Sequence, residues 1–170
     1  ANIGGKNLYA IPDAYTGPVA GIVNQFLGSA TGDIVLGTDK ADFINALAGD
    51  DAVNGGGGND VIDGGLGSNF ITGGAGIDKF FVDGRGAATS NTWSTITDFS
   101  AGEQLTIWGY QPGVSRLLWV ATSGVQGYTG ATLHGDLDGN GVIDTSVTFA
   151  GLSQAQLPMP SYGADYILFG

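Results

Sequence analysis

Apolar and polar residues follow a nine-residue period between Gly28 and Phe81. The six consecutive blocks read GSATGDIVL, GTDKADFIN, ALAGDDAVN, GGGGNDVID, GGLGSNFIT and GGAGIDKFF. Each block combines a six-residue turn with three strand residues, of which only the middle one can face a core because side chains alternate along a strand. The pattern predicts an all-β protein in which residues 28–82 form a parallel β-roll. The middle strand position, eighth in the block, is always apolar: Val35, Ile44, Val53, Ile62, Ile71 and Phe80.

The sixth position of the block is the candidate metal-ligating position, because it holds an aspartate or an asparagine in every block. Two blocks complete one circuit of a roll, so alternate blocks should stack at the strand spacing of about 4.8 Å. Two carboxylates about 5 Å apart repel by roughly 3 kcal/mol at an effective dielectric constant of about 20. A hard cation such as calcium would remove this repulsion, because it prefers carboxylate and carbonyl oxygens. The predicted columns are Asp33, Asp51 and Asn69 on one side, and Asp42, Asp60 and Asp78 on the other.

These columns predict about four bound calcium ions, one in each space between stacked neighbours, and ions at the ends of the roll could add to that number. The site between Asp60 and Asp78 should be the strongest, because both of its blocks match the pattern at every position. Sites in the first two blocks should be weaker, since Thr31 and Lys40 stand where the pattern has glycine. Asn69 supplies one neutral oxygen, so the site that uses it should also be weaker.

The segments on either side of the repeat predict two end-caps. Residues 1–27 are predicted to be an N-terminal segment followed by a short helix over 18–27, whose apolar residues have helical spacing. Residues 83–170 are predicted to form an antiparallel sheet that closes the far end of the roll. Its strands are expected at 92–99, 104–108, 115–121, 131–137 and 142–149, the last two joined by the turn sequence Asp138-Gly139-Asn140-Gly141.

Composition narrows the range of partners. The chain has 170 residues, with 16 acidic and 5 basic side chains and a formal net charge of −11. This charge argues against nucleic acid and against an anionic membrane surface as partners. The chain has no cysteine and no long apolar run, so we expect neither disulfides nor a membrane span. Because it begins at Ala1 without methionine, we expect it to be part of a longer protein whose preceding part carries the biological activity.

Two stretches of the sequence resemble a known family. GGGGNDVID and GGAGIDKFF resemble the nonapeptides of repeats-in-toxin (RTX, hemolysin-type) proteins. The following DKFFVDGRG and ITDFSAGEQLTI resemble the segment after the repeats in serralysin-type C-terminal domains. The resemblance implies a calcium-binding C-terminal module of a bacterial protein that type I secretion machinery exports to the medium or the cell surface. The terminal ADYILFG resembles the uncleaved export signal of such proteins.

The resemblance also implies which atoms bind calcium. The implied ligands are the sixth-position side chains together with turn carbonyl oxygens, such as those of Gly56, Gly58, Gly74 and Gly76. Asp98, within ITDF, is implied as a ligand of a further ion near the last turn.

A second acidic motif lies in the last predicted hairpin. Asp136, Asp138, Asn140, Gly141 and Asp144 have the spacing of the first nine positions of an EF-hand calcium loop. The twelfth position would be valine rather than glutamate, and the flanking residues predict strands rather than helices. Two interpretations remain open: a polar hairpin turn, or an additional calcium site held by Asp136, Asp138 and Asp144.

The sequence contains none of the common hydrolase motifs. There is no H-E-x-x-H, no G-x-S-x-G and no cysteine, and the single histidine, His134, should face solvent or neighbouring side chains of its strand. We therefore expect a non-catalytic module that folds when calcium binds after export. The alternative is a calcium-ordered adhesion, surface-layer or carbohydrate-binding module that binds cell-surface glycan or assembles with itself. Five aromatic residues could serve either core packing or such a surface: Trp93, Trp108, Trp119, Tyr110 and Tyr128.

Overall fold

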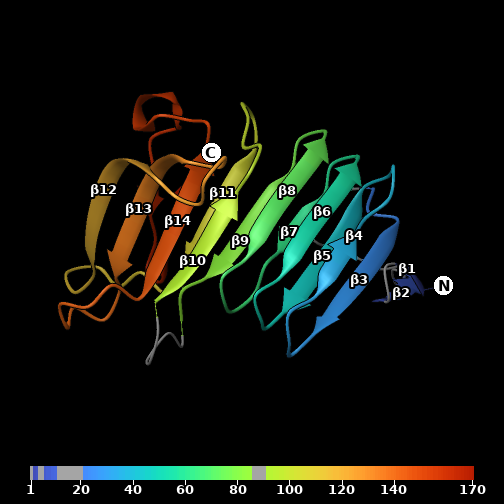
Figure 1. Cartoon of the computed structure of the whole chain (residues 1–170), viewed down its shortest axis with the longest axis horizontal. Coiled ribbons are helices and arrows are strands. Elements are labelled where there is room, and N and C mark those ends of the chain that lie inside the picture. The colour runs from blue at the N-terminus through green and yellow to red at the C-terminus, as the bar shows by residue number, and fades with distance from the viewer. Residues whose placement is uncertain (1, 4–5, 11–20, 86–90) are drawn as a thin grey trace.

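The computed structural model describes residues 2–3, 6–10, 21–85 and 91–170, and two facing β-sheets contain nearly all of their regular structure (Figure 1). The first sheet has nine strands. In spatial order they are β1 (Asn2–Ile3), β2 (Lys6–Ala10), β3 (Asn24–Ser29), β5 (Asp42–Leu47), β7 (Val61–Asp63), β9 (Lys79–Asp83), β11 (Gln104–Trp108), β16 (Tyr166–Phe169) and β15 (Ser161–Tyr162).

The second sheet has seven strands, and one short helical turn follows it in the chain. Its strands in spatial order are β12 (Arg116–Ser123), β13 (Gly130–Asp136), β14 (Thr145–Ala150), β10 (Thr92–Ile96), β8 (Phe70–Ala75), β6 (Ala52–Gly57) and β4 (Ile34–Leu36). The 3₁₀ turn η1 (Gln154–Gln156) is the only helical element among the described residues. Within that part of the chain, nothing has the length and apolar character of a membrane-spanning helix.

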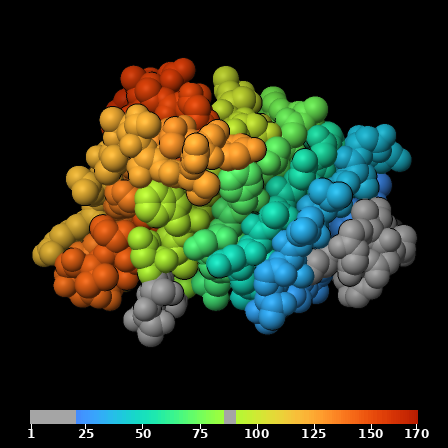
Figure 2. Space-filling model, viewed as in Figure 1, coloured from blue at the N-terminus to red at the C-terminus, as the bar shows by residue number. Residues whose placement is uncertain are grey.

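The repeat produces its two sheets by crossing from one to the other every nine residues. Strands β4, β6 and β8 pair in parallel on one side, and β5, β7 and β9 pair in parallel on the other. Partners are offset by one circuit of 18 residues, as in the hydrogen bonds between successive turns. This is the two-sided stacking that the nine-residue period predicts. Figure 2 shows the successive rungs as bands of colour across the face of the molecule.

A single file of apolar side chains fills the space between the two sheets of the roll. Each comes from the eighth position of a block, and each is at most 3% exposed. Burial of one such side chain contributes about 2 kcal/mol to folding, so this thin core is a modest source of stability. Its members are Val35, Ile44, Val53, Ile62, Ile71 and Phe80.

The helix predicted over residues 18–27 is wrong. Residues 18–20 lie outside the described part of the chain, but Asn24–Ser29 form strand β3, which pairs in parallel with β5. Phe26 is fully buried beside Ile44, whereas Val23 and Leu27, which a helix would have placed on the same apolar stripe, are 49% and 36% exposed. The roll therefore begins one rung earlier than predicted.

The physical reason is that the repeat extends upstream in a degraded form. Asn24 and Phe26 occupy the sixth and eighth positions of one more block, and the Asn24 amide donates to Asp42 Oδ1 at 2.5 Å. A helix would have left the edge of β5 without a partner in the ladder, and unpaired strand edges are unfavourable. This block is hard to recognise in the sequence because its sixth position is the neutral Asn24 rather than an aspartate.

The predicted antiparallel cap is partly wrong as well, because the C-terminal half first continues the parallel roll. Strand β10 pairs in parallel with β8 and with β14, and β11 pairs in parallel with β9. The circuit lengthens here from 18 to 25 residues, so the nine-residue period disappears although the stacking continues. Ile96 continues the core beside Ile71, and Leu105 continues it beside Phe80.

Antiparallel pairing appears at both ends of the molecule: β2 pairs antiparallel with β1 and β3 at the N-terminal end, and further antiparallel pairs close the C-terminal end. The predicted hairpin is present, with β13 and β14 paired antiparallel around a loop that spans residues 137–144. Strand β12 pairs antiparallel with β13, and the C-terminal β16 pairs antiparallel with β11. The end of the roll is thus closed by strands that extend its own two sheets.

Candidate metal sites

The sixth-position side chains form two columns inside the turns of the roll. Asp42, Asp60 and Asp78 are fully buried in one column, and in the other Asp51 and Asn69 are each 2% exposed. Their burial follows from the stacking, because each turn covers the side chain of the turn before it. Carboxylates are rarely buried in proteins unless they are paired or bind a metal, which makes the columns candidates for a function.

One oxygen of each carboxylate binds the backbone of the preceding turn on the same side. The Asp42 N–H donates to Asp60 Oδ1 at 2.8 Å, and the Asp60 N–H donates to Asp78 Oδ1 at 2.7 Å. The other column repeats the arrangement, with the Asp33 N–H donating to Asp51 Oδ1 at 2.8 Å. These bonds fix each carboxylate in one orientation, so its second oxygen also has a defined position.

The second oxygens of Asp60 and Asp78 are buried and have no hydrogen-bond partner. Each lies against the first glycine of its own block, Gly55 or Gly73, where a Cβ atom would collide with it. A buried anionic oxygen without a partner loses its hydration and gains nothing in return. Two such oxygens on neighbouring rungs, in turns rich in carbonyl groups, are suitable ligands for calcium.

The pKa values of Asp60 and Asp78 also show that burial disfavours their charged forms. Burial is the largest cause that raises the pKa of Asp60 to about 7; the charges of Asp78 and Asp42 also raise it, and the hydrogen bond from the Asp42 N–H lowers it. Burial is also the largest cause of the raised pKa of Asp78, to which Asp98 adds. Without a cation, the column therefore disfavours the charged form that calcium requires. A bound divalent ion would reverse this preference.

The first two turns satisfy their carboxylates differently. Ser29 donates to Asp33 Oδ2 through its N–H at 2.6 Å and its hydroxyl at 2.8 Å. Thr38 does the same for Asp42 Oδ2, at 2.6 and 2.9 Å. The complete blocks have glycine at this second position, so they supply no hydroxyl to Asp60 or Asp78. In the first two turns, a serine or threonine hydroxyl thus donates a hydrogen bond to the aspartate Oδ2. In the complete turns, the Oδ2 atoms of Asp60 and Asp78 receive no such bond.

Asn69 departs from the pattern in a way that opposes a cation. Its Oδ1 accepts the Asp51 N–H at 3.0 Å, as an aspartate would. Its Nδ2 donates to the carbonyl oxygen of Gly64 at 2.7 Å, and Gly64 is the first residue of its block. A donor group therefore lies where Asp60 and Asp78 present a free oxygen. The structure gives a physical reason for the weak site expected at this residue.

The turn glycines have left-handed backbone and leave no room for a side chain. At the second position Gly56 and Gly74 have φ of +98° and +100°, and at the fourth Gly58 and Gly76 have φ of +108° and +142°. A Cβ atom on Gly74 or Gly76 would collide with the backbone of the turn below. Close stacking of the turn carbonyls thus depends on glycine at these positions.

Asp98 lies next to the last turn of the roll, as the resemblance implies. Its two oxygens accept the N–H groups of Gly73 and Gly74 at 2.9 and 2.8 Å. Its charge contributes to the raised pKa values of Asp78 and Glu103, so the three carboxyls lie within electrostatic range of each other. Asp98 therefore caps the backbone of the final turn beside the Asp42–Asp60–Asp78 column.

Glu103 is a functional candidate that the sequence analysis missed. Gln104 pairs with Lys79, which places Glu103 one rung beyond Asp78 in the same column. Its side chain is 2% exposed, and its Oε2 accepts the Ser100 N–H at 2.7 Å. Burial first, then the charges of Asp78 and Asp98, raises its pKa to about 7. The signal in the sequence was the acid two residues before Leu105, but a 25-residue circuit hides it.

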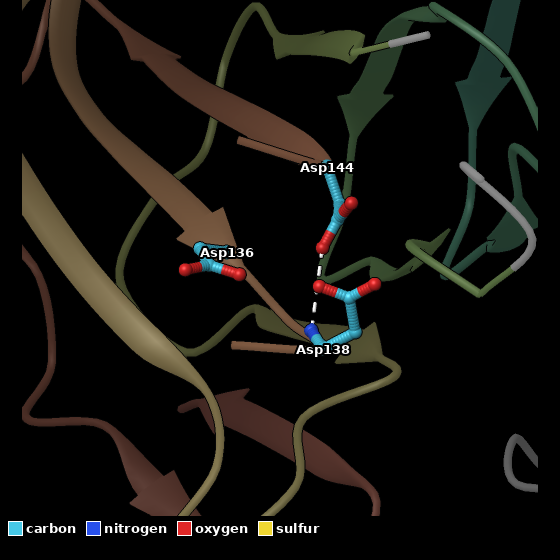
Figure 3. Close-up of side chains that lie close together, drawn as sticks. All are labelled: Asp136, Asp138 and Asp144. Carbon is cyan, nitrogen blue, oxygen red and sulfur yellow. Dashed lines mark hydrogen bonds between the residues drawn. The ribbon is translucent and has the colours of Figure 1, made fainter. Parts of the chain in front are cut away.

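The second acidic motif is also assembled in three dimensions. Asp136, Asp138 and Asp144 each bring a carboxylate oxygen within 4.8 Å of the other two, in the loop between β13 and β14 (Figure 3). Strands β13 and β14 lie toward the end of the molecule that is away from β3 and β4, the first strands of the roll (Figure 1).

The histidine and the aromatic residues of the C-terminal half have packing partners. His134 Nδ1 lies 2.7 Å from Ser146 Oγ, and its ring meets the Trp93 ring edge-on. Trp119 stacks on Phe149 and packs against the core, as does Tyr110. These contacts agree with the packing interpretation for Trp93, Trp119 and Tyr110, whereas Tyr128 meets the Phe70 ring edge-on and is 44% exposed.

The comparisons with known proteins identify the repeat. The family model described as RTX calcium-binding nonapeptide repeat (4 copies) matches residues 27–62 and, in an overlapping second match, residues 48–80. No curated protein matches the chain. Both matched segments lie in the part of the roll that contains the two columns of sixth-position side chains. Residues 27–80 of this chain are therefore RTX calcium-binding nonapeptide repeats.

Proposed function

We propose that this chain is a non-catalytic module that folds when calcium binds, and that it serves the export of a larger protein by type I secretion. The observation that carries the proposal is the pair of buried, unpartnered oxygens on Asp60 and Asp78. RTX repeats bind calcium, are generally non-catalytic, and typically occur in proteins exported by type I systems.

In this proposal the ions lie between stacked turns, where carboxylates and turn carbonyl oxygens surround them. The site between Asp60 and Asp78 is the strongest, with the carbonyl groups of Gly56, Gly58 and Gly74 among its neighbours. Sites that depend on Asp33, Asp42 or Asn69 are weaker, because Ser29, Thr38 and the Asn69 amide already take part of the ligand set. Four divalent ions would bring the formal net charge of −11 to about −3.

The energies are large enough for calcium to control folding. At about tenfold excess over a dissociation constant near 10⁻⁴ M, one site adds roughly 1.4 kcal/mol to the stability of the folded state. Four such sites add about 5–6 kcal/mol, which is comparable to the whole stability of a typical domain. Calcium is scarce in the cytoplasm and abundant outside, so the chain would stay unfolded until it leaves the cell.

The position of the C-terminal tail supports a link between folding and export. The signal-like residues 164–170 contain strand β16, whose Ile167 and Phe169 are 1% and 0% exposed. Strand β16 pairs along its length with β11, in the same nine-stranded sheet as β5, β7 and β9 of the roll. A secretion system could read this segment only while the chain is unfolded. Folding outside the cell would bury this segment, so the secretion system could no longer bind it and export would be irreversible.

The test is the export of a reporter protein fused before this chain, in a bacterium that has a type I system. We expect the fusion to reach the medium and to resist protease there only when calcium is present. Deletion of residues 164–170 should abolish export, because it removes the proposed signal. The variant Asp60→Ala should leave export intact and lose the calcium-dependent resistance. Export without residues 164–170 contradicts the secretion role, and protease resistance without calcium contradicts the folding role.

The alternative of an adhesion, surface-layer or carbohydrate-binding module has less support. It depends on aromatic side chains that present a surface to a ligand. Trp93 instead donates through Nε1 to Thr148 Oγ1 at 2.9 Å, and Trp119 stacks on the core residue Phe149. We therefore propose the folding and export role, with the protein placed in the medium or on the cell surface.

A further inference from the structure

The loop between β13 and β14 contains a cluster of acids that the RTX repeat does not explain. We propose that Asp136, Asp138 and Asp144 form a separate calcium site, built from one loop and independent of the stacked turns. The family match ends at residue 80, so these residues lie outside it. The proposal does not depend on calcium binding in the roll.

The geometry of the cluster suits one small cation. One carboxylate oxygen of each aspartate lies within 4.8 Å of the corresponding oxygen of the other two. Figure 3 shows the three carboxylates around a common space, with Asp136 on one side and Asp138 and Asp144 on the other. Three carboxylates at this separation repel each other, and a calcium ion coordinated by all three would remove that repulsion.

A second observation points to a ligand at this place. Asp136 is only 4% exposed, and its Oδ1 is buried without a hydrogen-bond partner. Its Oδ2 accepts the Gly141 N–H at 2.9 Å and lies 3.9 Å from Arg116 Nη1. The Arg116 side chain is 73% exposed, so this long contact with Asp136 Oδ2 is largely solvated. The buried Oδ1 still needs a positive partner.

The loop backbone already has the shape that such a site requires. Asp144 Oδ2 accepts the N–H groups of Leu137 and Asp138 at 2.6 and 3.3 Å, which closes the loop on itself. Asn140 Oδ1 accepts the Val142 N–H at 2.7 Å. Gly141 has φ of +92°, at the sixth position of the loop, where EF-hand loops also need glycine for a sharp turn. Because the loop is formed in advance, binding would cost little ordering.

The loop differs from an EF-hand in how it ends. The twelfth position is Val147, which is fully buried in β14 and belongs to the core. Asp144, at the ninth position, takes the place of the missing glutamate by reaching back to the start of the loop. The site would therefore join the end of β13 to the start of β14, and β14 links the hairpin to β10 of the extended roll.

Manganese can test the site in the folded, calcium-loaded chain, because it replaces calcium among oxygen ligands and broadens nearby NMR signals. We expect a small amount of manganese to broaden the amide signals of Asn140 and Gly141. The variant Asp138→Asn should reduce this broadening about tenfold or more, because the loss of one ligand charge weakens such sites strongly. Asp138 is exposed, so this change leaves the buried packing intact.

Two controls separate this site from the roll. The amide signals of Gly58 and Gly76 report on the stacked turns, and they should respond equally in the wild type and in Asp138→Asn. The variant Asp165→Asn removes an exposed carboxylate elsewhere and should leave the Gly141 response unchanged. Broadening of Gly141 without any at Gly58 and Gly76 would support this site and show that it takes up manganese independently of the stacked turns. A Gly141 signal that manganese leaves sharp, or broadens equally in Asp138→Asn, overturns the proposal.

Discussion

The variant Asp60→Ala should lose about 3 kcal/mol of calcium-dependent stability, because this residue contributes to the spaces on both sides of its turn and each site is worth roughly 1.4 kcal/mol. Asp33→Ala should lose about 1 kcal/mol or less. Asp33 stands in the first turn of its column, and Ser29 already binds its second oxygen. The measurement is the calcium midpoint of folding for each variant, followed by far-UV circular dichroism.

The stability of the variants without calcium provides a second test of this prediction. Asp60 Oδ2 is buried without a partner and its charge repels Asp42 and Asp78, so removal of the charge alone should not destabilise any residual calcium-free structure. The alanine variant also removes Oδ1, the acceptor of the Asp42 N–H. The variant Asp60→Asn is the matched control, because it keeps the shape and removes the charge. A calcium midpoint that shifts more for Asp33→Ala than for Asp60→Ala contradicts the ranking of the sites.

Gly74→Ala should be among the most destabilising single changes in the roll, at about 3 kcal/mol or more. Gly74 has φ of +100°, and a Cβ atom there would collide with the backbone of Gly56 in the turn below. To relieve the collision, the two turns must separate, and the carbonyl and carboxylate oxygens between them would separate with them. Denaturant unfolding in saturating calcium measures the loss.

Gly113→Ala is the matched control for this prediction. Gly113 also has left-handed backbone, with φ of +79°, but nothing lies within 4 Å of the position of its Cβ atom. It should therefore show only the cost of left-handed backbone for alanine, roughly 1 kcal/mol. Equal losses for the two variants would mean that the close approach of the turns contributes nothing.

The repeated part of the fold was predictable because one physical constraint recurs at a fixed spacing. A buried apolar residue such as Ile62 and a buried acid such as Asp60 return every nine residues, and this fixes strand, turn, register and facing side at once. The prediction of the fold was wrong where the stacking continues but the residue at the sixth position is no longer acidic. Asn24 keeps the sixth position without a charge, so the apolar spacing of residues 18–27 predicts a helix where strand β3 forms.

The C-terminal half was harder to predict because strand pairing there depends on distant residues. Alternation along residues 92–96 and 104–108 indicates strands, but it does not say whether their partners run parallel. The partners of β10 are β8 and β14, and the second of these lies some fifty residues away. Glu103 was missed for the same reason, since its place in the column depends on the register of β11 with β9.

The candidate metal ligands also differ in how far the sequence could predict them. Sequence alone identified the acids of the columns and of the hairpin loop, because spacing brings them together in any roll or tight loop. Only the structure shows which oxygens already have donors. The hydroxyl of Thr38 on Asp42 and the amide of Asn69 on Gly64 both depend on side-chain orientation.

Far-UV circular dichroism of this chain in EDTA and in millimolar calcium tests the central claim most directly. We expect a largely unordered spectrum in EDTA, a β-sheet spectrum in calcium, and full reversal when excess EDTA is added to the folded chain. The reason is that the buried carboxylates of the roll oppose folding until a cation lies between them. The same strand content in both solutions would contradict the account.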